Sequence, residues 1–462
     1  MERRSLWWIP LASLVCTTVF AFAAGEKAEV SGMGMAGAAF ASSKSLDAVG
    51  INPANLAMKD DPFTLSIACV GVQAGSDFLT YGLYKQYFTG VETGDGRVGK
   101  FLDETDKQKI LDAFRGGVGE LTADASLLLL GVSVQFPSIG GFAFTIIDQL
   151  AGMARIPNDY VRFLLYGNTP GSVYDFGRTS AHAAWLRYYT LSFGGTIAHP
   201  SFMKWLALGA AVKLVDGFGY YEVEQFNTSL ATSSNGILTG RVSYLARLAG
   251  LDPTRKQSGF TFSPFSQRAF GHGTGFDLGL AGGVGDAITI GVSLTDIGQV
   301  NWEERLEETI ADTTIVIDDP RQVEDGAAIE NALKGKKSAG SPFSRSLPAT
   351  LRTGIAVHVD KLVEWIPGEM IMAAAYTKGL ADAPGTTLYA RLSLGMEWSL
   401  LKFLPLRTGI AFGGTERASL AFGFGLHFGL FELDLATENV DVLWGGDEVS
   451  HASIAFGTRF TF

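Results

Sequence analysis

The sequence predicts an all-β protein, an antiparallel transmembrane β-barrel of about fourteen strands with an N-terminal hatch inside it and short helices in external loops. Apolar and polar residues alternate in segment after segment, and short connections alternate with long ones along the chain. The 462 residues are 47% hydrophobic with a mean hydropathy of +0.19, yet beyond the N-terminus no apolar run is long enough for a membrane helix. Dispersed apolar residues suit strands that turn only alternate side chains to lipid. A large soluble β-protein is the alternative.

The first residues predict a secretory signal peptide. Arg3 and Arg4 precede an apolar stretch over residues 6–20, and an Ala-Phe-Ala cleavage site follows at residues 21–23. We therefore expect a signal peptide over residues 1–24, a hatch over residues 25–61 and a barrel over residues 62–462. Cys16 would leave with the signal peptide, so Cys69 would be the only cysteine of the mature chain and no internal disulfide could form.

Period-two alternation places the strands, because successive side chains of a strand point to opposite faces and a bilayer requires one face to be apolar. In residues 288–295, for example, isoleucine, valine and leucine alternate with threonine, glycine and serine. The predicted strands cover residues 62–73, 125–136, 140–150, 181–197, 205–215, 273–284, 287–298, 348–359, 370–378, 386–398, 405–413, 417–428, 430–436 and 451–462.

The connections between these strands support the barrel independently. Residues 137–139, 285–286 and 429 form very short connections, whereas residues 74–124, 151–180, 216–272 and 299–347 form long ones. Bacterial barrels pair short periplasmic turns with long external loops. With both termini in the periplasm, all the long connections fall on the external side.

Two short helices are expected in the external loops. Thr105 and Gln108 have capping-box spacing ahead of an amphipathic stretch. A second helix over residues 157–167 carries Tyr160, Phe163 and Leu164, which is more apolar surface than an exposed loop normally shows. This helix either packs on other loops as a lid or forms a hydrophobic surface that captures a ligand.

The N-terminal glycine-rich stretch matches the sequence pattern of a dinucleotide-binding fingerprint but not the structural context that the motif needs. Gly32, Gly34 and Gly37 have the G-x-G-x-x-G spacing, but that motif binds a nucleotide only between a strand and a helix of a βαβ unit. Here it follows a signal peptide directly. Glycine instead allows the backbone to fold tightly and approach other backbone inside a crowded lumen.

The stretch from Gly32 to Gly37, followed by Asn52, Pro53, Ala54, Asn55 and Leu56, resembles the FadL-like outer-membrane transporters of long-chain fatty acids and other hydrophobic compounds. The resemblance implies a fourteen-stranded barrel closed by an N-terminal hatch with its Asn-Pro-Ala turn at residues 52–54. At the N-terminus the resemblance lies in particular residues, whereas over the rest of the chain it lies only in the predicted architecture. Related N-terminal sequences also occur in secretion-associated and uncharacterised barrels, and the first external loop is most similar to the uncharacterised ones.

In that family a ligand leaves sideways beside a kinked third strand. In the predicted third strand, Phe142, Phe144 and Ile146 share one face, and the apolar Ile147 followed by the polar Asp148 suggests a slip of phase. We therefore place the candidate lateral opening at Ile147 and Asp148. Ordinary fraying of the strand towards the external loop is an equally good explanation.

Several charged residues fall on the predicted lumen face. They are Asp277, Arg352, His358, Arg391, Glu397, Arg407, His427, Glu432, Asp434 and Arg459. Charges inside a barrel of this width pair with one another or hold a plug. The alternative is that Arg391 or Arg407 receives the carboxylate head group of a ligand by a bidentate contact.

No enzyme signature, cofactor motif or metal-ligand spacing is present among the six histidines and two cysteines. The net charge of -11 argues against a nucleic-acid partner. The expected partners are outer-membrane lipid, a hydrophobic small molecule and the outer-membrane assembly machinery, which would recognise a terminal strand ending in Phe460, Thr461 and Phe462. The sequence thus predicts passive uptake across the outer membrane of a Gram-negative-type bacterium through loop capture, hatch movement and lateral exit. A non-transporting barrel that acts as a scaffold or secretion-associated partner is the alternative.

Overall fold

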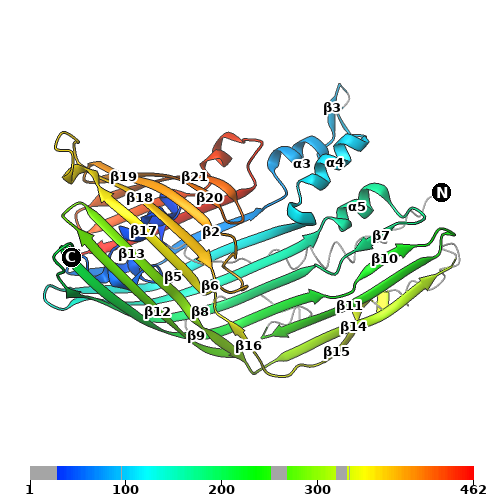
Figure 1. The fold of residues 1–462 in the computed structure, drawn as a ribbon, viewed down its shortest axis with the longest axis horizontal. Coiled ribbons are helices and arrows are strands. Elements are labelled where there is room, and N and C mark those ends of the chain that lie inside the picture. Colours follow the sequence, from blue (N-terminus) through cyan, green and yellow to red (C-terminus); the bar gives the residue numbers. More distant parts are fainter. Residues whose placement is uncertain (1–28, 95, 251–267, 319–329, 332) are drawn as a thin grey trace.

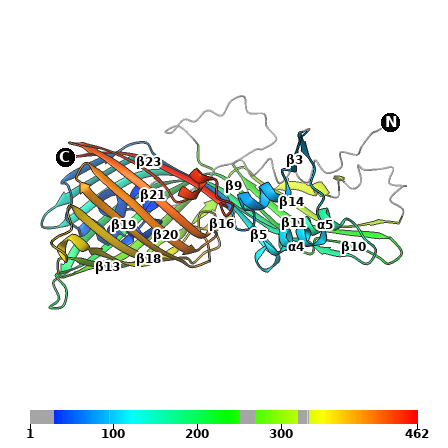
Figure 2. The ribbon, with the colours of Figure 1, turned by 90° about the horizontal axis from the view of Figure 1, so that it is seen from above.

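The computed structural model is a closed barrel of fourteen antiparallel staves, where a stave is one strand or two short strands in line, and it confirms the predicted fold class. The structure describes residues 29–94, 96–250, 268–318, 330–331 and 333–462. The signal peptide expected at residues 1–24 lies outside the described residues. Two short strands in line, β1 (Phe63–Ser66) and β2 (Cys69–Ser76), form the first stave. Both pair with β5 on one side and with β23 on the other, which closes the ring (Figures 1 and 2).

The remaining staves follow in chain order, and each pairs with the next around the ring. They are β5 (Val118–Phe136), β6 (Gly140–Pro157), β8 (Ser180–Ala198), β9 (Trp205–Gln225), β12 (Gly271–Val284), β13 (Ile288–Trp302), β17 (Thr350–His358), β18 (Glu369–Gly379), β19 (Arg391–Leu401), β20 (Leu404–Gly413), β21 (Arg417–Phe428), β22 (Phe431–Thr437) and β23 (His451–Thr461). Every predicted strand overlaps one stave. The largest differences at a strand start are in β5, which begins seven residues before the predicted residue 125, and in β19, which begins five residues after the predicted residue 386.

A band of exposed apolar side chains surrounds the barrel. It includes Phe144 on β6, Leu278 on β12, Val292 on β13 and Phe422 on β21. The residues that alternate with them face the lumen and are buried, as Ser293 is beside Val292. An exposed belt of this extent requires a hydrocarbon environment, so the barrel spans a membrane. Separately, among the helices in the described part of the chain, none has the length and hydropathy needed to cross a membrane.

At one end the sheet continues beyond the apolar band, where the sequence predicted long irregular loops. β9 pairs with β12 over its first part and with β11 (Leu238–Ala249) over its last. β11 in turn pairs along its length with β14 (Leu306–Ile317). The smaller strands are β7 (Val173–Asp175), β10 (Ser229–Thr232), β15 (Lys336–Ala339) and β16 (Phe343–Ser346), with a separate hairpin of β3 (Val91–Thr93) and β4 (Gly96–Val98). The loop prediction was wrong here because strands outside the membrane need no apolar outer face, so their alternation is weak.

Three α-helices lie at this extended end (Figure 1), namely α3 (Tyr81–Tyr87), α4 (Glu104–Asp112) and α5 (Asp159–Tyr166). Both predicted helices are present, but the predicted cap of α4 was wrong. The side chain of Asp103, not Thr105, accepts a hydrogen bond from the Asp106 backbone N–H at 2.8 Å. An aspartate is a stronger helix cap than a threonine, and Glu104 and Asp106 add favourable charge to the first turn.

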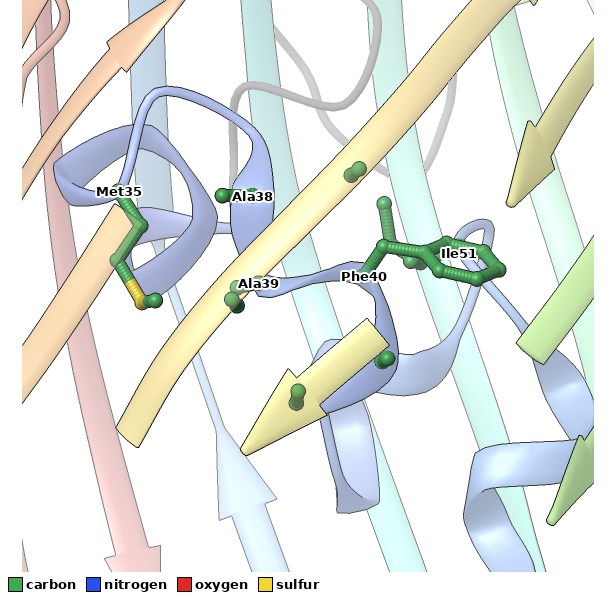
Figure 3. Close-up of a cluster of buried hydrophobic side chains, with 9 residues drawn as sticks. Met35, Ala38, Ala39, Phe40 and Ile51 are labelled. Atoms are coloured by element: carbon green, nitrogen blue, oxygen red, sulfur yellow. The ribbon is translucent and has the colours of Figure 1, made fainter. Parts of the chain in front are cut away.

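Residues 29–61 lie inside the barrel, towards the end that holds the C-terminus, and we call them the hatch (Figures 1 and 2). The hatch consists of α2 (Val30–Gly34) and three short 3-10 helices, Ala38–Ala41, Ser45–Ala48 and Pro53–Ala57. Figure 3 shows Met35, Ala38, Phe40 and Ile51 in one buried cluster, which also includes Ala356 of β17 and Ala373 of β18. Small wall residues therefore let the hatch fill the lumen.

Glycines on the lumen face of the wall bring the hatch backbone very close. A Cβ atom at Gly209 would overlap the backbone of Pro53 and Ala54, and one at Gly409 would overlap the backbone of Met35. The hatch contacts further wall glycines at Gly141, Gly194, Gly279, Gly291, Gly354, Gly395, Gly423 and Gly457. We call these ten residues the glycine belt. The glycine belt therefore lets the hatch pack closely against the wall.

We predict that Gly209→Ala lowers the free energy of unfolding by about 1–3 kcal/mol, because the added methyl group must displace the hatch or the wall. Urea unfolding of the folded barrel in lipid vesicles, followed by tryptophan fluorescence, measures this loss. Gly99→Ala is the matched control because nothing lies within 4 Å of the position of its Cβ; it should change stability by less than about 0.5 kcal/mol. Equal effects of the two substitutions would contradict the close packing of the hatch.

Candidate functional site

The Asn-Pro-Ala turn fastens the hatch to the wall through one side chain. The Asn52 side chain accepts a hydrogen bond from the Ala54 backbone N–H at 3.1 Å and donates one to the Leu280 carbonyl of β12, also at 3.1 Å. Pro53 occupies the first position of the following 3-10 helix, where a missing N–H costs nothing. Asn52, Pro53 and Ala54 are all buried, so the turn predicted from the sequence lies at the contact between the hatch and the wall.

Other polar contacts hold the hatch at several points of the ring. The hydroxyls of Ser45 and Ser133 lie 2.5 Å apart, and the Ser293 hydroxyl donates to the Ile51 carbonyl at 2.6 Å. Arg459 of β23 forms an ion pair with Asp47. These contacts join the hatch to β5 and β23, which flank the first stave, and to β13 on the other side of the ring.

The predicted glycines of the hatch serve close packing. Gly32 and Gly34 lie in α2, and Gly34 packs against Gly423 of β21. Gly37 has a φ of 81°, a left-handed conformation that favours glycine, and it begins the next 3-10 helix. Gly34 thus has a packing role and Gly37 a conformational one, whereas a Cβ atom at Gly32 would meet only the side chain of Glu29.

A cavity of about 110 Å³ lies directly against the hatch. Leu46, Asp47, Val49 and Ile51 line it from the hatch. From the wall it is lined by Leu128, Thr145, Ile147, Tyr188, Lys213, Asp296 and Arg459, among others. It combines apolar side chains with charged and hydroxyl groups, which is the composition of a site that orients a small ligand.

An aromatic cluster covers the wall beyond this cavity, towards the extended end. Tyr188 belongs both to the cavity lining and to a buried cluster that contains Tyr220, Trp302 and Leu347. The rings of Tyr220 and Trp302 lie 5.4 Å apart, and Trp302 is 1% exposed. The cavity therefore has the hatch on one side and this aromatic cluster on the other.

A connection from the far side of the ring crosses the mouth of the barrel. Asp382, between β18 and β19, accepts hydrogen bonds of 2.8 and 2.9 Å from Arg155 at the end of β6, although β6 and β18 stand nearly opposite in the strand order. These bonds hold the pKa of the Asp382 carboxyl below its usual value. Arg155 also pairs with Glu120 at 3.0 Å, so a bridge of three charged groups spans the mouth.

The two arginines considered as head-group receptors are both paired with acidic side chains. Arg407 contacts Glu397 at 2.6 Å and also Asp434, and the Arg407 side chain is 5% exposed. Arg391 lies 3.3 Å from Glu438 and 3.7 Å from Glu416, and it also reaches the Ala36 carbonyl of the hatch at 3.4 Å. A ligand carboxylate at either arginine would have to compete with two protein carboxylates. The geometry favours the pairing hypothesis over the head-group hypothesis.

The lumen holds a further charged cluster that the sequence analysis identified only in part. Asp277 was placed on the lumen face, but its partner Lys213, at 2.9 Å, and Asp296, which binds the same ammonium group at 2.6 Å, were not. Lys213 could have been found from its position, because it interrupts the apolar-small alternation of β9 on the face that carries Gly209 and Ala211. Asp296 could not, because it adopts a φ of 57° where β13 departs from regular alternation.

The proposed capture surface on α5 is mostly packed within its own loop region. Tyr160 stacks on Phe176 with ring centroids 4.3 Å apart, and Phe163 packs edge-on against Tyr174 at 5.2 Å. Leu164 is the exposed member, at 66%. None of these residues lines the cavity. Capture of a ligand by Tyr160, Phe163 and Leu164 remains a prediction, and the observed contacts agree with the lid alternative.

The wall is continuous at the candidate lateral opening. Ile147 pairs with Leu128 and Tyr188, and Asp148 pairs with Leu127 and Arg187, so β6 has a partner on both sides. The irregularity lies in the neighbouring strand, where Leu129 is the extra residue between two partners of β6. The β5–β6 pairing is thus irregular beside Ile147, but the extra residue belongs to β5, and the lateral opening stays a prediction. Ile147 faces the cavity, whereas Asp148 forms a buried ion pair with Arg187.

His427, Glu432 and Asp434 approach one another within 4.8 Å across the β21–β22 hairpin. Strand pairing sets Glu432 directly opposite His427, which no spacing in the sequence indicates. Asp434 is already bound by Arg407, and Arg459 lies 4.0 Å from Glu432. Two guanidinium groups beside these carboxylates disfavour a cation there, so we assign the three residues to the ion-pair network of the lumen.

The fold and this site define a transmembrane β-barrel whose lumen is filled by its own N-terminal segment. The chain belongs to a family of unknown function, DUF5723, whose model matches residues 53–438. No curated protein matches the chain in sequence.

Solved structures that are similar to the chain include the Ralstonia pickettii toluene transporter TbuX, with 12% identity and a TM-score of 0.46 over 94% of this chain and 98% of that one. A Pseudomonas aeruginosa FadL homologue has 13% identity and a TM-score of 0.46 over 96% and 100% of the two chains. The Pseudomonas putida toluene transporter TodX has 12% identity and a TM-score of 0.44 over 95% and 98%.

We predict that Arg407→Met lowers the free energy of unfolding by about 3–5 kcal/mol, because it leaves the carboxylates of Glu397 and Asp434 without their partner in the lumen. Urea unfolding in lipid vesicles measures the change. The matched control is Arg241→Met, which breaks an exposed pair with Asp312 and should cost about 1 kcal/mol or less. A triple variant with Glu397→Gln and Asp434→Asn added should recover part of the loss. Unchanged stability together with weaker binding of a carboxylate ligand would instead favour the head-group hypothesis.

Proposed function

We propose that the protein is an outer-membrane channel for the passive uptake of small hydrophobic molecules and that the hatch is its gate. The cavity beside the hatch carries this proposal, because it is a space in the lumen that is lined both by the hatch and by the wall. The apolar outer belt places the barrel in a membrane, and a barrel of this kind with a terminal strand ending in phenylalanine supports residence in the outer membrane of a Gram-negative-type bacterium. Recognition of that strand by the assembly machinery is part of the same proposal.

The size of the cavity restricts what it holds in this conformation. An apolar cavity of about 150 Å³ is large enough for benzene. At about 110 Å³ the present cavity is smaller than that, so a single ring is the upper limit for a ligand in this conformation. An extended fatty acyl chain would need the hatch or the aromatic cluster to move before it could enter.

Release past the hatch is energetically easier than release through the wall at Ile147 and Asp148. Opening β6 breaks strand pairing on both sides, and each backbone group left unpaired in lipid costs several kcal/mol. Displacement of the hatch instead exposes polar groups such as Asn52 and Asp47 to water, where each hydrogen bond exchanged costs about 0.5–1.5 kcal/mol. We therefore propose hatch movement as the main route and lateral exit as the secondary one.

The rival function is a barrel that transports nothing and serves as a scaffold. The sheet formed by β9, β11 and β14 beyond the apolar band favours it, because this sheet enlarges the surface outside the membrane. The scaffold hypothesis requires a rigid hatch and no uptake, so a hatch that can be locked and released distinguishes the two functions.

We predict that a disulfide between the hatch and the wall abolishes uptake reversibly. The hydroxyls of Ser45 and Ser133 lie close enough for the double variant Ser45→Cys/Ser133→Cys to form a disulfide, and Cys69→Ser removes the competing thiol. Uptake of labelled toluene and of a labelled long-chain fatty acid by cells that express the oxidised variant should fall to the level of cells without the protein. Reduction should restore it.

The single-cysteine variants Ser45→Cys and Ser133→Cys, each with Cys69→Ser, are the matched controls and should transport in both redox states. A variant lacking residues 24–60 should transport faster than the intact protein. Equal uptake by cells with and without the intact protein would overturn the transport proposal. Uptake that is unaffected by the disulfide would overturn the hatch as the gate.

A further inference from the structure

Two residues that line the cavity carry a buried hydroxyl group that makes no hydrogen bond with any described residue. They are Tyr188 of β8 and Thr145 of β6, which are 4% and 1% exposed. Strand pairing makes Thr145 the neighbour of Thr190, and Tyr188 lies two residues before Thr190 on β8, so the two side chains point into the lumen side by side. A buried hydroxyl without a partner is costly, and a ligand that supplies a partner recovers this cost on binding.

The charged groups around the cavity disfavour an anion. Its lining has four acidic side chains, Glu29, Asp47, Asp296 and Asp434, and two basic ones, Lys213 and Arg459. Both cations are already occupied, since Lys213 lies between Asp277 and Asp296 and Arg459 pairs with Asp47. A ligand carboxylate would find no free cation and an excess of acidic groups, so its desolvation would not be compensated.

From these two observations we infer that the cavity is a binding site for an uncharged, single-ring compound that carries a hydroxyl group, such as a phenol. The ring occupies the space between Ile147, Leu128 and the hatch residues Val49 and Ile51, and its hydroxyl exchanges hydrogen bonds with Tyr188 and Thr145. Unsubstituted hydrocarbons leave both protein hydroxyls unpaired. Aromatic carboxylates meet the acidic lining. The inference rests on the proposed function for its access route and specifies the ligand of that site.

The experiment compares phenol, toluene and benzoate as ligands of the purified full-length chain in lipid nanodiscs at pH 7, by isothermal titration calorimetry. We expect phenol to bind at least tenfold more tightly than either toluene or benzoate. Tyr188→Phe and Thr145→Val should each weaken phenol binding by about tenfold and leave toluene binding unchanged. Tyr376→Phe, which removes a hydroxyl beside the lipid-facing groove of β18, is the matched control and should bind phenol as the wild type does.

Thermal unfolding midpoints separate a binding role from a structural one. Because the hydroxyls of Tyr188 and Thr145 are unpaired in the protein, their removal should not lower the midpoint. Equal affinities for phenol and toluene, tighter binding of benzoate, or no binding of any of the three would overturn the inference. The measurement involves no transport, so selective phenol binding together with a failed uptake assay would refute the channel and retain the binding site.

Discussion

Contact between the hatch backbone and the glycine belt is the constraint on which the rest of the structure depends. Wall residues such as Gly209 and Gly409 have no side chain, so the hatch backbone can approach the backbone of the wall directly. The hatch must then supply its own hydrogen bonds, and the short 3-10 helices and the Asn52 cap do so within very few residues. A glycine-rich wall and a compact hatch therefore require each other.

The paired charges of the lumen have a related role. Burial of an unpaired charge is far more costly than burial of a matched pair, and Arg391, Arg407 and Arg459 each lie between two carboxylates. Arg459 and Arg391 also contact the hatch itself, through Asp47 and the Ala36 carbonyl. These contacts fix where the hatch sits around the ring, whereas the glycine belt fixes how closely it approaches the wall. The position of the hatch around the ring and its distance from the wall therefore have separate physical causes, and either one can change without the other.

Within the membrane the sequence was sufficient to predict the staves, because lipid imposes a strict alternation such as that of Val292 and Ser293. Beyond the membrane this requirement ends, which is why β11 and β14 were taken for loops. The Asn-Pro-Ala turn could be located from its residues alone, but its bond to Leu280 depends on a contact 228 residues away along the chain. Lys213 likewise binds Asp296, which lies 83 residues away along the chain, and the extra residue at Leu129 shifts a register that no local pattern reveals.

The cavity lies between the aromatic cluster and the hatch, and residues of both line it. Tyr188 belongs to the aromatic cluster on one side, and Val49 and Ile51 belong to the hatch on the other, yet all three line the same space. A ligand in this cavity contacts the hatch and the aromatic cluster at the same time. It can favour opening of either one only by binding the open state more tightly than the closed state. A ligand that fits the closed cavity well therefore stabilises the closed barrel. Transport requires that, as the hatch moves, the contacts of the ligand with Val49 and Ile51 weaken less than the hydrogen bonds and ion pairs between the hatch and the wall.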